Sequence, residues 1–177
     1  MKWRSPVGDD TGEFWPAGWF DATGFLTLYD YGYHTGADMN CNVPVWDTDR
    51  GSPVYAIAPG VVIFAGAGSG TWGNLIVIRH DNGGKKVWSR YGHVENMTVK
   101  KGDVVAGGQQ IATIGNAGGV FPYHLHFDIV KTDVLEAAPG HWPGSDEQKV
   151  LDNYVDPLVF LRESALEEGG NVTTNLL

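Results

Sequence analysis

Hydrophobic residues in this chain occur in short runs of strand length, and clusters of Gly, Pro, Asn and Asp separate the runs. The segments that fit strands are 51–66, which reads as two strands around a Pro59-Gly60 turn, 73–80, 86–93, 110–115 and 121–130. Residues 81–84, Asp-Asn-Gly-Gly, are a strong hairpin signal between two of these segments. This pattern predicts a domain that is mainly β.

The segment 121–130 has the most informative alternation. Successive side chains of a strand point to opposite faces, so its apolar residues share one face and its polar residues share the other. The apolar set is Tyr123, Leu125, Phe127 and Ile129, and the polar set is His124, His126 and Asp128. One face can therefore pack a core, while the other carries two imidazoles that need a metal, a substrate or each other as partners.

The two ends of the chain and one internal segment do not fit the strand pattern. Residues 1–28 are rich in aromatic and turn-forming residues, so we expect an ordered, loop-like arm that packs on the domain 29–162. Residues 131–153 read as a polar insertion that contains Pro and Gly. The Asp-Pro pair at 156–157 fits the start of a short C-terminal helix, and residues 163–177 are expected to be a disordered tail.

Composition narrows the class of protein. The chain has 177 residues, of which 42% are hydrophobic and 12% aromatic, with 25 Gly and 9 Pro, which suits one compact β-rich domain with many tight turns. The formal net charge of −9 and the lack of a long basic run argue against binding to nucleic acid. No hydrophobic run approaches the roughly 20 residues of a membrane span. The first ten residues show no secretory signal peptide.

A second polar motif lies far upstream of the histidine strand. His34 and Asp38 are four residues apart in a glycine-flanked segment, so an extended conformation is favoured and would place both side chains on one face. Imidazole and carboxylate are good zinc ligands, and three protein ligands with one open position are typical of catalytic zinc sites. One histidine of the His124/His126 pair would complete such a site. His93 supplies a further imidazole that the metal does not need.

Seven short motifs follow one another along residues 29–161. They are His34-x-Gly36-x-Asp38, Gly51-x-Pro53-Val54-Tyr55-Ala56, Gly60-Val61-Val62, Tyr91-Gly92-His93, Gly102-Asp103-x-Val105, Gly115-x-x-Gly118 and His124-Leu125-His126-Phe127. In this order they resemble the lysostaphin-like zinc endopeptidases of bacterial peptidoglycan. The resemblance implies a mainly antiparallel β-sheet domain with a narrow groove whose floor holds one zinc ion.

By that resemblance, His34, Asp38 and His126 are the zinc ligands, and His93 and His124 are the catalytic pair. The implied function is hydrolysis of peptide cross-links or stem peptides of peptidoglycan. Inactive relatives have lost ligand residues, so a silent wall-binding or hydrolase-activating domain is the alternative, but here all five positions are filled. We expect a monomer that acts in the extracellular space, the periplasm or the cell wall, from a bacterium or as a phage-derived lysin.

The residue types fit zinc-dependent hydrolysis independently of the family resemblance. The chain has no His-Glu-x-x-His segment, so an imidazole is the candidate general base, and the sequence leaves open whether it is His93 or His124. Asp128, on the same strand face as His126, is a candidate to orient that ligand.

Several other residues receive interpretations of their own. We expect Cys41 to be a small buried thiol, His80 to make a local hydrogen bond beside the hairpin turn, and His141 to lie on the surface or at the groove wall. By the same resemblance, one tyrosine could lie close to the metal and stabilise the tetrahedral intermediate, and the candidates are Tyr29, Tyr31 and Tyr33. Residues 99–111 also resemble a biotinyl or lipoyl carrier module, which would need an exposed lysine at a hairpin tip and has no use for the histidines.

Overall fold

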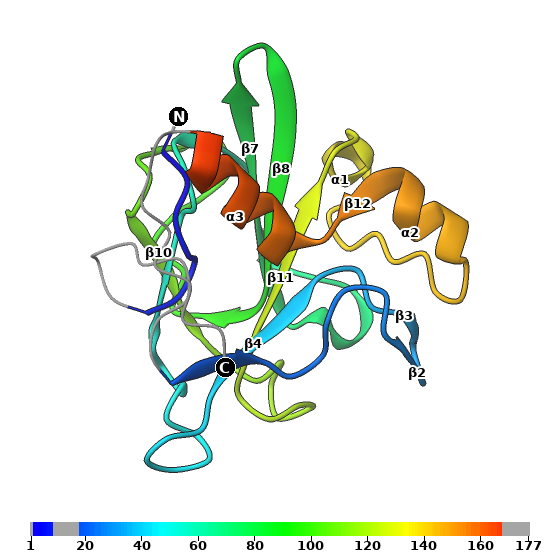
Figure 1. Ribbon diagram of the computed structural model, residues 1–177. Helices are drawn as coiled ribbons and strands as arrows, with labels where there is room; N and C mark the ends of the chain where they lie inside the picture. The colour runs from blue at the N-terminus through cyan, green and yellow to red at the C-terminus, as the bar shows by residue number, and fades with distance from the viewer. Residues whose placement is uncertain (1, 9–17, 168–177) are drawn as a thin grey trace.

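A computed structural model describes residues 2–8 and 18–167 of the chain (Figure 1). The strands are β1 (Trp19–Asp21), β2 (Leu28–Tyr29), β3 (Gly32–Tyr33), β4 (Ala37–Cys41), β5 (Pro53–Tyr55), β6 (Gly60–Ala67), β7 (Asn74–Asn82), β8 (Lys85–Glu95), β9 (Val104–Val105), β10 (Gln110–Ile114), β11 (Leu125–Val130) and β12 (Tyr154–Val155). The helices are the 3-10 helix η1 (Gly70–Trp72) and the α-helices α1 (Val134–Ala137), α2 (Glu147–Asn153) and α3 (Pro157–Glu167).

Ten of the described strands belong to one sheet, and β2 and β3 form a separate hairpin. The main path of the sheet is β1-β4-β11-β8-β7-β6-β9, with β12 beside β11, and β10 beside β8 and β5. All pairings among the described residues are antiparallel. The prediction of a mainly β, antiparallel domain is therefore confirmed.

The predicted hairpin connects β7 to β8, the two longest strands. Their register runs from Asn74 opposite Val94 to Asn82 opposite Lys85. The turn between them contains Gly83 and Gly84, both at positive φ, a backbone conformation that glycine adopts without steric cost. This hairpin forms the middle of the sheet and places β8 directly beside β11.

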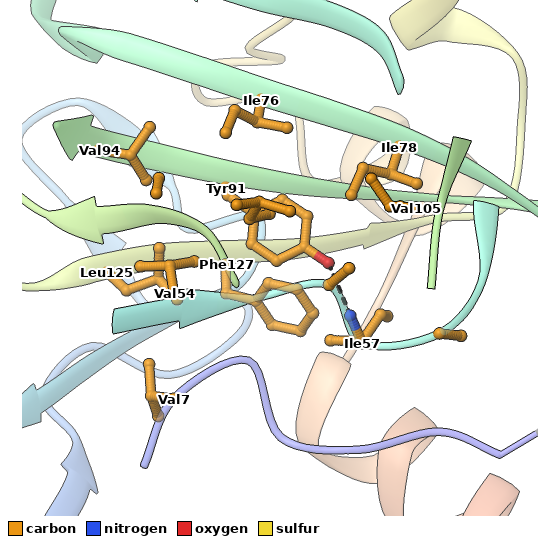
Figure 2. Close-up of a cluster of buried hydrophobic side chains, with 14 of the residues drawn as sticks. Val7, Val54, Ile57, Ile76, Ile78, Tyr91, Val94, Val105, Leu125 and Phe127 are labelled. Atoms are coloured by element: carbon orange, nitrogen blue, oxygen red, sulfur yellow. Dashed lines mark hydrogen bonds between the residues drawn. The ribbon is translucent and has the colours of Figure 1, made fainter. Parts of the chain in front are cut away.

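The alternation of 121–130 decides which face of β11 meets the core. Leu125, Phe127 and Ile129 are fully buried in the larger hydrophobic cluster. The ring of Phe127 lies next to that of Tyr91, with centroids 5.4 Å apart (Figure 2). The Tyr91 hydroxyl also accepts a hydrogen bond of 3.0 Å from the backbone N–H of Ile57. The opposite face of the strand is left for the polar side chains, as the alternation predicts.

The N-terminal segment packs on this core. Trp3 and Val7 are buried in the larger cluster, and β1 adds a strand to the edge of the sheet by pairing with β4. Part of the expected arm, residues 9–17, lies outside the described residues.

The segment 131–153, which the sequence indicates is a polar insertion, contains the helices α1 and α2. Leu135 and Val150, one from each helix, are fully buried in a second hydrophobic cluster with Trp88. In Figure 1, α1 and α2 lie on one side of the β7–β8 hairpin, and β10 with the N-terminal segment lies on the other. The apolar positions are too few and too widely spaced along the sequence to show a helical period.

The C-terminal helix α3 begins where the sequence indicates. The side chain of Asp156 accepts hydrogen bonds from the backbone N–H groups of Leu158 and Val159, and Pro157 is the first helical residue. The helix continues to Glu167, so the expected tail was wrong for residues 163–167, and the rest of that tail lies outside the described residues. In the part of the chain that the structure describes, no helix is long and apolar enough to cross a membrane.

Candidate metal centre and active site

Two adjacent strands, β4 and β11, and the connection before β4 bring the candidate ligands to one point of the sheet. β11 lies between β4 and β8, and His126 is opposite Asp38 on one side and Gly92 on the other. His34 lies in the short connection between β3 and β4. His34, Asp38 and His126 each offer one ligand atom, and these atoms lie within 4.8 Å of one another.

The spacing of these atoms suits a tetrahedral metal. Nε2 of His34 is 3.0 Å from Oδ1 of Asp38 and 3.0 Å from Nδ1 of His126, and the last two atoms are 3.1 Å apart. Metal–ligand distances of about 2.0–2.1 Å in tetrahedral zinc sites correspond to ligand atoms about 3.3 Å apart. The three atoms are thus close to the arrangement that zinc requires.

The other ring nitrogen of each histidine fixes its tautomer. Nδ1 of His34 is 3.3 Å from the carbonyl oxygen of Gly24, and Nε2 of His126 is 3.0 Å from Oδ2 of Asp128. Because a carbonyl or carboxylate oxygen can only accept, these nitrogens carry a proton, and in the neutral rings the lone pairs are on the nitrogens that face each other. Two ring nitrogens and a carboxylate oxygen at this spacing need a proton or a metal cation between them, and this donor set fits zinc.

Two motif glycines allow the strands to approach this closely. A Cβ at Gly36 would overlap the carbonyl oxygen of Phe127 and come within 2.7 Å of Oδ1 of Asp128. A Cβ at Gly92 would lie 3.2 Å from both Cβ of His126 and the ring of Trp72. Packing around the site therefore requires the glycine of the His-x-Gly-x-Asp motif and leaves little room for a side chain at the glycine of the Tyr-Gly-His motif.

His93 and His124 lie beside this cluster, with ring centroids 4.7 Å apart. Nδ1 of His93 donates to the carbonyl oxygen of Trp72 at 3.0 Å, and Nδ1 of His124 donates to that of Pro122 at 2.8 Å. Each ring therefore keeps a lone pair on Nε2, and Nε2 of His124 is 3.7 Å from Oδ1 of Asp38. His93 has φ 62°, a strained backbone conformation of the kind that clusters at functional sites.

Burial and neighbouring charges set the protonation of these groups. Burial, together with the charges of His124 and His126, lowers the pKa of His93 to about 3. Burial also lowers the pKa of His124. Burial would raise the pKa of Asp38, but its close contacts with His126 and His34 hold it well below its usual range. The catalytic candidates are thus neutral imidazoles near pH 7, able to accept a proton, beside an ionised carboxylate.

Aromatic rings from separate segments surround the cluster. They belong to Tyr29, Tyr31, Trp72, Phe121 and Trp142. The rings of Tyr31 and Phe121 meet edge to face with centroids 6.2 Å apart, and Phe121 is 5.1 Å from the ring of His93. Of the three candidate tyrosines, Tyr29 lies 5.8 Å from the ring of His34, whereas Tyr33 packs against the second hydrophobic cluster.

Sequence reasoning missed Arg90 and Trp72. Arg90 is fully buried, and its Nε donates to Oδ2 of Asp128 at 2.6 Å. The charged residue in the middle of the predicted strand 86–93 was the available signal, because a charge within a buried strand needs a partner. Trp72 follows a glycine-rich stretch that has no periodic pattern, so nothing local marked it.

The remaining candidates lie apart from the cluster. Cys41 is a buried thiol, as expected. His80 does not make a merely local hydrogen bond: it is fully buried, with Nδ1 2.9 Å from the Pro59 carbonyl oxygen and Nε2 2.8 Å from Oγ of Ser89. His141 lies in the insertion, where its Nδ1 is 2.8 Å from the hydroxyl of Tyr154.

The sequence profile of peptidase family M23 matches residues 32–138, more than half of the chain. The chain belongs to peptidase family M23. Among its relatives, lipoprotein NlpD of Yersinia enterocolitica is 41% identical over 80 residues, which are 45% of this chain and 78% of that protein. Peptidoglycan DD-endopeptidase ShyA of Vibrio cholerae is 39% identical over 97 residues, which are 55% of this chain and 20% of ShyA. This M23 chain therefore corresponds to about a fifth of ShyA.

Solved structures show the same fold. The catalytic domain of lysostaphin from Staphylococcus simulans superposes with a TM-score of 0.57 at 26% identity, covering 81% of this chain and 90% of that domain. A zinc-containing peptidase from Vibrio cholerae gives a TM-score of 0.55 at 27% identity, covering 73% of this chain and 36% of that one. The expected resemblance to lysostaphin-like peptidases is thus confirmed in family and fold.

Proposed function

We propose that this M23 domain is a zinc-dependent endopeptidase that hydrolyses peptide cross-links or stem peptides of bacterial peptidoglycan, on the outer side of the cytoplasmic membrane. The observation that carries the proposal is the convergence of ring nitrogens of His34 and His126 with the Asp38 carboxylate, beside the imidazoles of His93 and His124. Three protein ligands leave the open position that a hydrolytic zinc site needs.

Three residues would bind the metal, and two others would transfer protons. Zinc held by His34, Asp38 and His126 would supply a Lewis acid for the scissile carbonyl and lower the pKa of a water molecule. The free Nε2 atoms of His93 and His124 then accept the proton of the attacking water and return a proton to the leaving nitrogen. Their Nδ1–H groups stay bound to backbone carbonyls, which hold both rings in place.

The aromatic rings around the cluster support a peptide substrate with small side chains. Tyr31 and Phe121 come from different loops and touch each other near the ring of His93. We infer that these rings narrow the approach to His93, so glycine or alanine next to the scissile bond fits better than a bulky residue.

Metal content and hydrolysis of defined muropeptides test the proposal. The purified protein should contain one zinc per chain, chelation should abolish hydrolysis, and added zinc should restore it. His34→Ala or Asp38→Ala should lose zinc and activity together. His93→Ala should keep zinc and lose roughly 10²–10⁴-fold in kcat.

His80→Gln is the matched control at pH 7, because His80 lies outside the cluster and bonds the Pro59 carbonyl and Ser89, and it should keep both zinc and activity. A fully active His93→Ala enzyme would refute the catalytic role of His93. A zinc-loaded protein that cleaves none of the cross-link types would instead support the silent, hydrolase-activating alternative.

A further inference from the structure

Arg90 is a charged residue in the interior of the domain, and its guanidinium donates to acceptors from several segments of the chain. Besides donating to Asp128, its Nη1 donates to the carbonyl oxygens of Pro139 at 3.1 Å and His141 at 2.8 Å. Its Nη2 donates to Oγ1 of Thr35 at 3.4 Å. The guanidinium group can donate to these acceptors at the same time, because its N–H groups lie in one plane and point outward in fixed directions.

The Asp128 oxygen that binds Arg90 also binds a candidate zinc ligand. Oδ2 of Asp128 accepts from Nε of Arg90 at 2.6 Å and from Nε2 of His126 at 3.0 Å. This second bond keeps the proton on Nε2 and leaves the Nδ1 lone pair facing the metal position. The orientation of His126 therefore depends on a carboxylate that Arg90 holds in place.

The guanidinium also contacts the residue that orients His93. The carbon atom Cζ of Arg90 lies 4.1 Å from the ring centroid of Trp72, within the range of a cation–π interaction. The carbonyl oxygen of Trp72 accepts the Nδ1–H of His93, and its ring stacks on that histidine at 6.0 Å. One buried cation thus touches the orienting group of the metal ligand and that of the catalytic candidate.

We propose that Arg90 is a positioning residue of the metal centre, which fixes His126 through Asp128 and His93 through Trp72, and ties the 139–141 segment to both. The proposal rests on the proposed zinc site but not on hydrolysis. The ring of Trp72 also bonds this segment, since its Nε1 donates to the carbonyl oxygen of Gly140 at 3.1 Å.

Arg90→Lys tests the proposal, because lysine keeps the positive charge but cannot reach the same acceptors in one plane. Zinc affinity of the folded protein is measured by competition with a chromophoric chelator. The visible spectrum of the cobalt-substituted protein reports the ligand geometry. We expect zinc binding about 10–100-fold weaker, an altered cobalt spectrum, and a shifted pH profile of kcat.

Two control variants separate positioning from general effects. Arg79→Lys changes a partly exposed arginine on β7 that pairs with Glu136, and its zinc affinity should stay within about twofold of the wild type. Tyr91→Phe removes a core hydrogen bond away from the site, so it should lose stability without losing zinc affinity. If Arg90→Lys binds zinc as tightly as Arg79→Lys, with the cobalt spectrum of the wild type, the proposal is overturned.

A double variant keeps the test decisive if Arg90→Lys does not fold. Arg90→Met with Asp128→Asn removes both buried charges, an exchange that proteins often tolerate, and retains an oxygen that can accept from His126. Zinc affinity at least tenfold weaker than that of Tyr91→Phe supports the role of Arg90, and unchanged affinity overturns it. A wild type that binds zinc but cleaves no muropeptide would refute the proposed enzyme and leave this comparison valid.

Discussion

His80 makes the stability of the domain depend on pH. Its side chain is fully buried against the ring of Trp3, with centroids 5.4 Å apart, and it is not part of the metal centre. Burial lowers its pKa from 6.5 to about 4, although the hydrogen bond to the Pro59 carbonyl oxygen acts in the opposite direction. The folded protein therefore keeps His80 neutral at a pH where the unfolded chain would bind a proton.

The sign and size of the effect follow from this difference in pKa. Because the folded pKa lies below the unfolded value, the full stability is present above about pH 6.5 and is lost as the pH falls toward about 4. Between pH 7 and pH 5 the loss from this one group is about 2 kcal/mol. For a domain of this size, that corresponds to a decrease in Tm of about 4–8 °C.

Urea unfolding of wild type and His80→Gln at pH 7 and pH 5 measures the effect. Glutamine retains a donor and an acceptor but does not titrate, so the difference in unfolding free energy between the two proteins should change by about 2 kcal/mol. Other titrating groups, including the metal site, are common to both proteins and cancel. Ser89→Ala, which keeps the histidine, should retain the pH dependence. A difference that is the same at both pH values would refute this reasoning.

Three further predictions concern the core and the site. Tyr91→Phe leaves the buried N–H of Ile57 without an acceptor and should lower the free energy of unfolding by about 1–3 kcal/mol in urea titrations; an unchanged midpoint would contradict this. Gly36→Ala would place a methyl group against the Phe127 carbonyl oxygen and should abolish stoichiometric zinc binding in metal analysis, whereas full zinc content would show that β4 and β11 can separate. Phe121→Ala should raise kcat/KM for substrates with bulky residues relative to glycine substrates, and an unchanged ratio would exclude this ring from substrate selection.

The sequence by itself determined the longer strands and the side-chain chemistry of the candidate site. Alternation in 121–130 and the turn at 81–84 are local properties, because a period of two and a glycine at positive φ need only neighbouring residues. The same alternation places the side chains of His126 and Phe127 on opposite faces of the strand. The residue types also limited the chemistry, since two imidazoles and one carboxylate suit zinc wherever they meet. Their roles as ligands stay a prediction.

Only the tertiary structure decided how these residues are oriented. The tautomer of His34 depends on the carbonyl of Gly24, and that of His126 on Asp128, which Arg90 holds from a neighbouring strand. The burial of His80 likewise depends on Trp3, which is far away in the chain. These features arise from strand register and from packing between distant segments, and no local pattern contains them because they depend on contacts that exist only after the sheet has formed.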